Sequence, residues 1–134
     1  MSGTLVDSNV LLDLLTSDTA WSEWSASALE QCANKGTLCI DAVIYAEVSI
    51  GFNRIEEVEA ALPEASFRRL PLPFEAAFLA GKAFLRYRRQ GGSRTSTLPD
   101  FFIGAHAAVA GLRLLTRDAS RYRAYFPTVE IIAP

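Results

Sequence analysis

The stretch GTLVDSNVLLDLLTS, residues 3–17, joins a short β-rich run to a segment with helical periodicity. Its first five residues, GTLVD, are mostly small, β-branched or apolar, and the run ends in Asp7. The apolar residues that follow recur at helical spacing, at Val10, Leu11, Leu14 and Leu15. The pattern predicts a strand that runs directly into a helix, with a carboxylate at the junction.

The rest of the chain repeats this alternation. Further short strands are expected at residues 37–40, 66–72, 112–118 and 128–132. Further helices are expected at residues 19–36, 42–52, 54–62 and 74–90, from residue 99 onward in the apolar stretch that ends at 112, and at 119–126. Strands that alternate with helices predict an α/β fold, in which a parallel sheet is covered on both faces. Ligands of such folds bind outside the carboxyl ends of the strands.

Glycine, aspartate and proline mark several of the predicted boundaries. Gly36 is a helix stop, and Asp41 is a suitable N-cap for the helix that follows. Pro71 and Pro73 restrict the segment before them to an edge strand. Pro99 lies in a first helical turn, where its missing amide hydrogen costs nothing.

Length and composition indicate one globular domain spanning residues 1–134, with 50% hydrophobic and 21% charged residues. No apolar run approaches the roughly 20 residues that span a bilayer, and the first residues do not resemble a signal peptide. We therefore expect a cytoplasmic protein that is not inserted in a membrane. The spacing of Cys32 and Cys39 matches no redox or zinc motif, so both are expected to be reduced, packed thiols.

Charge is divided unevenly along the chain. Residues 1–67 contain eleven acidic side chains and two basic ones, whereas residues 68–134 contain four acidic and eleven basic ones. The basic half includes a run just before residue 99 with four arginines: Arg86, Arg88, Arg89 and Arg94. These arginines suit the phosphates of a nucleic acid, although solvated helix faces would explain the same pattern.

Four acidic residues occupy positions that suggest chemistry. Asp7 and Asp118 lie where a strand meets a helix, and each alone could be an ordinary N-cap. Glu47 and Asp100 project from helix faces that are otherwise apolar, where a carboxylate seldom stays charged without a partner. Small residues on the face of Asp100, such as Gly104, are expected to leave room below its carboxylate.

The four acids make sense together if the fold gathers them around a divalent cation. Their mutual repulsion would otherwise oppose clustering, and hard carboxylate oxygens suit Mg²⁺ or Mn²⁺. On this interpretation Asp100 lies in core-like sequence because it is buried against the metal. Water on an incompletely ligated Mg²⁺ can attack a phosphodiester, so the expected reaction is phosphodiester hydrolysis.

The segments LVDSNVLLDLL, YAEVSIGF and LPDFFIGAHAAVAGLRLLTRDASRY, in this order, closely resemble the PIN-domain ribonucleases, and in particular the VapC toxins of type II toxin-antitoxin systems. The resemblance covers nearly the whole chain. It implies a PIN-like α/β/α sandwich around a mainly parallel sheet, Mg²⁺-dependent cleavage of RNA, a homodimer, and inhibition by a small cognate antitoxin.

The resemblance also assigns roles to residues. Asp7 and Asp100 match the principal metal ligands, Glu47 matches a second acid that acts directly or through water, and Asp118 matches a more variable fourth position. Polar residues that match positions orienting the acids are Ser8, Asn9 and Thr116, each of which could also be a cap or turn residue.

Two other classes of function share some of these sequence features. A phosphoacceptor receiver domain needs an acidic pair after its first strand and a late lysine, but Ser8 and Asn9 follow Asp7 and the last lysine is Lys82. A PIN-like module that binds RNA or protein without turnover is the remaining alternative.

His106 lies six residues after Asp100, a spacing that points its side chain away from that of Asp100 on a helix. We therefore expect a packed, hydrogen-bonded histidine rather than a general base. Trp21 and Trp24 are expected in the core or an interface, with base stacking as the alternative.

Overall fold

The computed structural model describes residues 3–93 and 98–134, and within them five short strands form one sheet, all paired in parallel. The strands are β1 (Thr4–Val6), β2 (Leu38–Ile40), β3 (Arg68–Arg69), β4 (Arg113–Leu115) and β5 (Ile131–Ile132). Their order in the sheet is β3-β2-β1-β4-β5. The predicted parallel sheet is confirmed, and β3 is an edge strand as expected.

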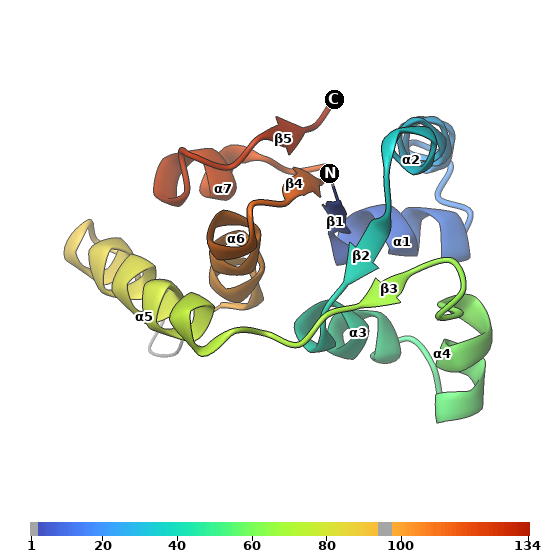
Figure 1. The fold of residues 1–134 in the computed structure, drawn as a ribbon, viewed down its shortest axis with the longest axis horizontal. Coiled ribbons are helices and arrows are strands. Elements are labelled where there is room, and N and C mark those ends of the chain that lie inside the picture. Colours follow the sequence, from blue (N-terminus) through green and yellow to red (C-terminus); the bar gives the residue numbers. More distant parts are fainter. Residues whose placement is uncertain (1–2, 94–97) are drawn as a thin grey trace.

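Helices connect the strands and lie on both sides of the sheet (Figure 1). They are α1 (Ser8–Leu15), α2 (Ser22–Lys35), α3 (Ala42–Ser49), α4 (Ile55–Ala61), α5 (Phe74–Arg89), α6 (Pro99–Ala110) and α7 (Ser120–Tyr125). In Figure 1, α1 and α2 lie on one side of the strands, and α5, α6 and α7 lie on the other. This arrangement confirms the expected α/β/α sandwich.

The order of the strands creates a switch point between β1 and β4. From β1 the chain builds outward through β2 to β3, and then crosses over to add β4 and β5 on the other side of β1. The connections from β1 and from β4 therefore leave in opposite directions, which opens a crevice at the carboxyl ends of these two strands. Asp7 directly follows β1, and Thr116 directly follows β4.

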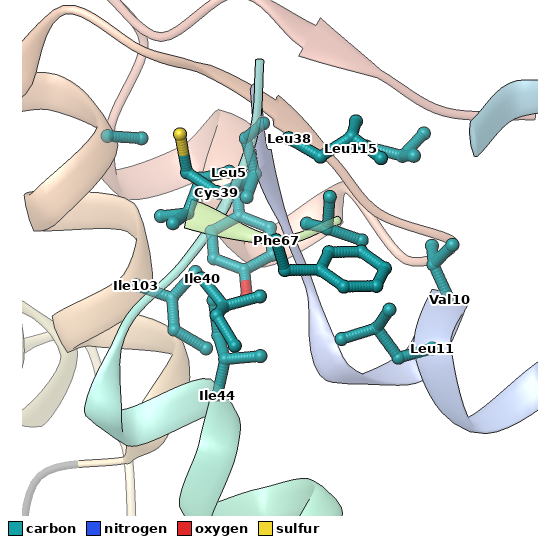
Figure 2. Packing of buried hydrophobic residues seen from close by; sticks show 14 of the residues in the cluster. Leu5, Val10, Leu11, Leu38, Cys39, Ile40, Ile44, Phe67, Ile103 and Leu115 are labelled. Atoms are coloured by element: carbon teal, nitrogen blue, oxygen red, sulfur yellow. The ribbon is translucent and has the colours of Figure 1, made fainter. Parts of the chain in front are cut away.

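The core explains why these short strands are stable. Every residue of β1 and β2 is buried, as expected for a parallel sheet that is covered on both faces. Figure 2 shows Ile40, Ile44 and Ile103 gathered together from β2, α3 and α6. Burial of such side chains stabilises the fold by roughly 1.5–3 kcal/mol each.

The predicted helix boundaries agree with the structure. The Asp41 carboxylate accepts a hydrogen bond from the Ile44 amide at 2.9 Å and so caps α3. Gly36 is the C-cap of α2, and Pro99 is the first residue of α6. Gly111, which ends α6, has a φ of 68°, a conformation that favours glycine.

Gly104 does not leave the open space that we expected from the sequence. A Cβ atom at this position would lie 2.3 Å from the Phe126 ring, so the ring fills the space beside α6. Glycine is required here by the close approach of the two segments, and the space expected beside Gly104 is filled by the ring.

The two cysteines are buried and unpaired, as predicted. None of the described helices combines the length and the apolar character required to cross a membrane.

Candidate active site

Asp7 is the most buried acid at the switch point, and three donors hold its carboxylate. Its Oδ1 accepts a hydrogen bond from the Ser8 amide at 2.7 Å. Its Oδ2 accepts hydrogen bonds from the Thr116 hydroxyl and the Tyr122 hydroxyl, both at 2.8 Å. Burial raises the pKa of Asp7, the two hydroxyl donors oppose this effect, and the nearby Asp100 carboxylate raises the pKa further.

The carboxylates of Asp100 and Asp7 both contact the same hydroxyl group and therefore lie close together. Tyr122 Oη lies 3.3 Å from Asp100 Oδ1, and Arg121 Nη1 donates to Asp100 Oδ2 at 3.2 Å. The Asp100 side chain is 35% exposed, so the expectation that it is buried was wrong. It lines a cavity rather than the core, while its neighbours Phe101 and Ile103 are among the buried residues of α6.

Glu47 joins the same group of acids through Ser8. The Ser8 hydroxyl donates to Glu47 Oε1 at 2.8 Å and lies 3.5 Å from Asp7 Oδ1. Burial raises the pKa of Glu47, and repulsion from Asp7 and Asp100 adds to the effect, against the hydrogen bond from Ser8. The helix face around Glu47 is less buried than expected, because the apolar residue Ile50 on that face is 86% exposed.

Asp118 differs from the other three acids. It is exposed, and its carboxylate accepts hydrogen bonds from the Ser120 amide at 3.4 Å and the Ser120 hydroxyl at 3.2 Å. These are local contacts two residues along the chain, which form a turn ahead of α7, and the N-cap of α7 is Ala119 rather than Asp118. Asp118 and Asp100 line one cavity of about 290 Å³, so the cavity joins the two carboxylates although they make no direct contact.

The donor chemistry of this site fits a hard divalent cation. Within residues 3–93 and 98–134, no three histidine, cysteine, aspartate or glutamate side chains already converge at metal-binding distance. However, burial and, to a smaller extent, repulsion between the acids raise the pKa of Asp7 and Glu47, and the Arg121 guanidinium pairs with Asp100. The site therefore favours positive charge, and carboxylate oxygens are the ligands that Mg²⁺ prefers.

Comparison with known proteins identifies the family. The PIN domain family profile matches residues 4–127. The chain belongs to the PIN domain family. A search of the curated proteins finds no match to the chain.

Solved structures share this PIN domain fold at low sequence identity. The structure of VapBC2 from Rickettsia felis bound to a promoter DNA fragment matches with a TM-score of 0.74 and 16% identity over 98% of both chains. DNA-bound VapBC from Salmonella typhimurium matches with a TM-score of 0.72 and 18% identity over 99% of this chain and 98% of that chain. FitAcB from Neisseria gonorrhoeae matches with a TM-score of 0.72 and 21% identity over 96% of both chains.

The predicted supporting polar residues all lie in the PIN domain site. Ser8 contacts Asp7 and Glu47, and Thr116 contacts Asp7. Asn9 Nδ2 donates to the Thr116 hydroxyl at 3.2 Å, and its Oδ1 accepts from the amide of residue 117 at 3.1 Å. Asn9 therefore acts on the acids through Thr116 rather than directly.

Tyr122 is a site residue that sequence reasoning missed. Its hydroxyl is the contact shared by Asp7 and Asp100, and burial, followed by the two acids, raises the pKa of Tyr122 well above its ordinary value. The side chain therefore stays a protonated donor at neutral pH. The only sequence signal is an aromatic residue with a polar end, four positions after Asp118 in a predicted helix.

His106 is packed and hydrogen-bonded, as predicted, and its partner is Asp41. His106 Nδ1 lies 2.8 Å from Asp41 Oδ2, and both side chains are buried. This pair connects the start of α3, which carries Glu47, to the middle of α6, which carries Asp100.

The predicted RNA-binding arginines lie partly within the described residues. Arg86, Arg88 and Arg89 are exposed at the end of α5, and Arg86 lies over the Tyr125 ring at 5.1 Å. Tyr125 also lines the cavity beside Asp100, so Arg86 is near the site. Arg94 lies outside the described residues. Trp21 and Trp24 are half-buried and pack edge to face, 6.4 Å apart.

The raised pKa values of Asp7 and Glu47 predict how stability depends on pH in this PIN domain. A raised carboxyl pKa stabilises the fold below the unfolded-state pKa, and this contribution is lost as pH rises through the folded-state value. In EDTA, urea unfolding should therefore show stability falling as pH rises above the ordinary carboxyl pKa values of 3.8 and 4.5. Added Mg²⁺ should weaken this fall, and Asp7→Asn should flatten it. Parallel curves of stability against pH for wild type and Asp7→Asn would contradict the raised pKa of Asp7.

Proposed function

We propose that this PIN domain is a metal-dependent endoribonuclease, the toxin of a toxin-antitoxin pair, which hydrolyses RNA phosphodiesters. The observation that supports it is the grouping of Asp7, Glu47 and Asp100 at the switch point, connected by the hydroxyls of Ser8 and Tyr122. Acids that repel one another are retained at a site when a cation or a reaction requires them.

In this mechanism Asp7 and Asp100 are the principal ligands of Mg²⁺, or of Mn²⁺ in its place. Glu47 acts directly or through water, and Asp118 is the fourth acid. A bound divalent cation would lower the pKa of a water and stabilise negative charge on the leaving oxygen. The hydroxyls of Thr116 and Tyr122 hold the Asp7 carboxylate in one orientation by donating to its Oδ2.

The metal requirement can be tested with the pure protein. Cleavage of single-stranded RNA is expected with Mg²⁺ or Mn²⁺, with 5′-phosphate ends on the products, and it should stop in EDTA and return when Mg²⁺ is added in excess. Activity that survives thorough chelation would remove this mechanism. RNA binding without cleavage in any metal would instead support the alternative, a catalytically inactive RNA- or protein-binding PIN module.

The solved relatives support the proposed partner. They are VapBC2 and VapBC, both bound to DNA, and FitAcB. By analogy we propose that a small cognate antitoxin inhibits this chain in the cytoplasm, with a basic or aromatic tail that enters the acidic crevice. Asp100 and Glu47 provide the charge that would attract such a tail.

We also propose that the chain forms a homodimer. Helix α5 exposes two large apolar side chains one turn apart, Phe74 at 91% and Phe78 at 69%. Sedimentation equilibrium at micromolar concentration should show a dimer, and Phe78→Asp should shift it toward monomer if α5 is in the interface. Wild-type protein that sediments only as a monomer would contradict the proposal.

A further inference from the structure

Of the arginines that follow β4, Arg117 and Arg121 differ in their surroundings. Arg117 donates through Nε and Nη2 to both oxygens of Asp13, at 2.9 and 3.0 Å. Asp13 is buried and also accepts from the Ser25 hydroxyl at 2.8 Å, while the Arg117 guanidinium lies 5.3 Å from the centre of the Trp21 ring. The charge of Arg117 is thus matched by a buried carboxylate, and its role is to hold the loop after β4 against α1.

Arg121 is held in place while most of its donors remain unused. In the part of the chain that the structure describes, its side chain makes one hydrogen bond, from Nη1 to Asp100 Oδ2. The guanidinium lies 5.8 Å from the centre of the Tyr87 ring and 5.9 Å from that of Phe101, and the side chain is 38% exposed. A guanidinium has five N–H donors, so most of those of Arg121 remain available to a ligand.

These donors belong to a residue that lines an open cavity next to the acids. The cavity of about 290 Å³ is lined by Tyr87, Asp100, Asp118, Ser120, Arg121 and Tyr125. A planar guanidinium that rests on aromatic rings suits a phosphate group, because it can donate two parallel hydrogen bonds to it. Asp100 on one wall places such a phosphate within reach of the proposed reaction centre.

We propose that Arg121 binds a backbone phosphate of single-stranded RNA in this cavity, adjacent to the bond that is cut. This inference rests on the proposed function. It has a second consequence, because Arg121 and a metal ion would both interact with Asp100. Removing the guanidinium should therefore weaken RNA binding and strengthen Mg²⁺ binding, two effects in opposite directions that a purely structural role would not produce.

The experiment compares Arg121→Ala with Arg123→Ala. Arg123 lies on the same helix, is exposed, and lines a different cavity with Phe126 and Val129, so it is a matched control for the loss of one charge. RNA binding is measured by fluorescence anisotropy with a short single-stranded RNA, in an Asp7→Asn background that prevents cleavage. Arg121→Ala should bind about ten-fold more weakly, and its salt slope should fall by about 0.7.

Mg²⁺ binding is measured by titration calorimetry on proteins that retain Asp7. Arg121→Ala should bind Mg²⁺ several-fold more tightly than wild type and Arg123→Ala, and Arg121→Lys should restore the wild-type Mg²⁺ affinity and part of the RNA affinity. Thermal melts of all variants verify that they are folded.

The outcomes separate this inference from the proposed function. If wild type cleaves RNA but Arg121→Ala and Arg123→Ala bind RNA equally, with the same salt slope, Arg121 is not a phosphate ligand and the proposed function stands. If Arg121→Ala loses RNA and Mg²⁺ affinity together with thermal stability, its role is structural and the inference is wrong. If wild type neither binds nor cleaves RNA, the proposed function is wrong, and this inference, which rests on it, is wrong as well.

Discussion

Asp100→Asn should reduce RNA cleavage by about 10³-fold or more while the protein stays folded. A metal ion contributes several kcal/mol of transition-state stabilisation, and each 1.4 kcal/mol, roughly, changes the rate ten-fold. The fold should not suffer, because Leu98 is the N-cap of α6 and, among residues 3–93 and 98–134, the Asp100 side chain forms hydrogen bonds only with Tyr122 and Arg121. Single-turnover cleavage and thermal melts, with and without Mg²⁺, measure the two effects.

Stability without metal should hold or rise in Asp100→Asn, because the substitution removes one of the charges that raise the pKa of Asp7 and Glu47. Asp18→Asn is the matched control. Asp18 accepts hydrogen bonds from the amides of Ala20 and Trp21, and asparagine caps about as well as aspartate, so this variant should retain full activity. A fully active Asp100→Asn protein would overturn the assignment of this acid to the metal.

His106→Ala should lower the free energy of unfolding by about 3 kcal/mol, with a smaller loss of turnover. Removing the imidazole leaves the buried Asp41 carboxylate without its partner, and breaking a buried pair in this way typically costs roughly 3–5 kcal/mol. The lower end applies, because Asp41 keeps its hydrogen bond from the Ile44 amide. Urea denaturation of wild type and variant at one pH measures the difference.

A double-mutant cycle with Asp41→Ser isolates the pair. Serine keeps a capping oxygen at the start of α3 but cannot reach His106 as the carboxylate does, so the two substitutions together should cost less than the sum of their separate costs. Additive costs would mean that the pair does not stabilise the fold. A His106→Ala protein that is fully stable but inactive would move the chemistry to the imidazole.

Local patterns in the sequence determined the elements of this fold. Residues 3–17 predict a strand and a helix in immediate succession, and β1 and α1 lie where the pattern placed them. The same local logic found the cap at Asp41 and the start of α6 at Pro99, because capping and proline effects act within one helical turn. Alternation of strands and helices then limits the sheet to a parallel one.

The sequence also indicated that Asp7, Glu47 and Asp100 share a site, because acids at strand ends and on apolar helix faces need a common explanation. The structure brings these three together, and their roles as ligands remain predictions. Asp118 is the weakest member, because the observed hydrogen bonds of its carboxylate are local ones to Ser120.

Only the tertiary structure decided which polar groups meet. Asp41 pairs with His106 across 65 positions, Asp13 pairs with Arg117 across 104, and Tyr122 reaches Asp7 across 115. Periodicity describes which face of an element is buried, but not which side chain of another element faces it. That depends on the crossover that places β4 beside β1 and on the packing of α6 and α7, which sets contacts between residues far apart in the chain.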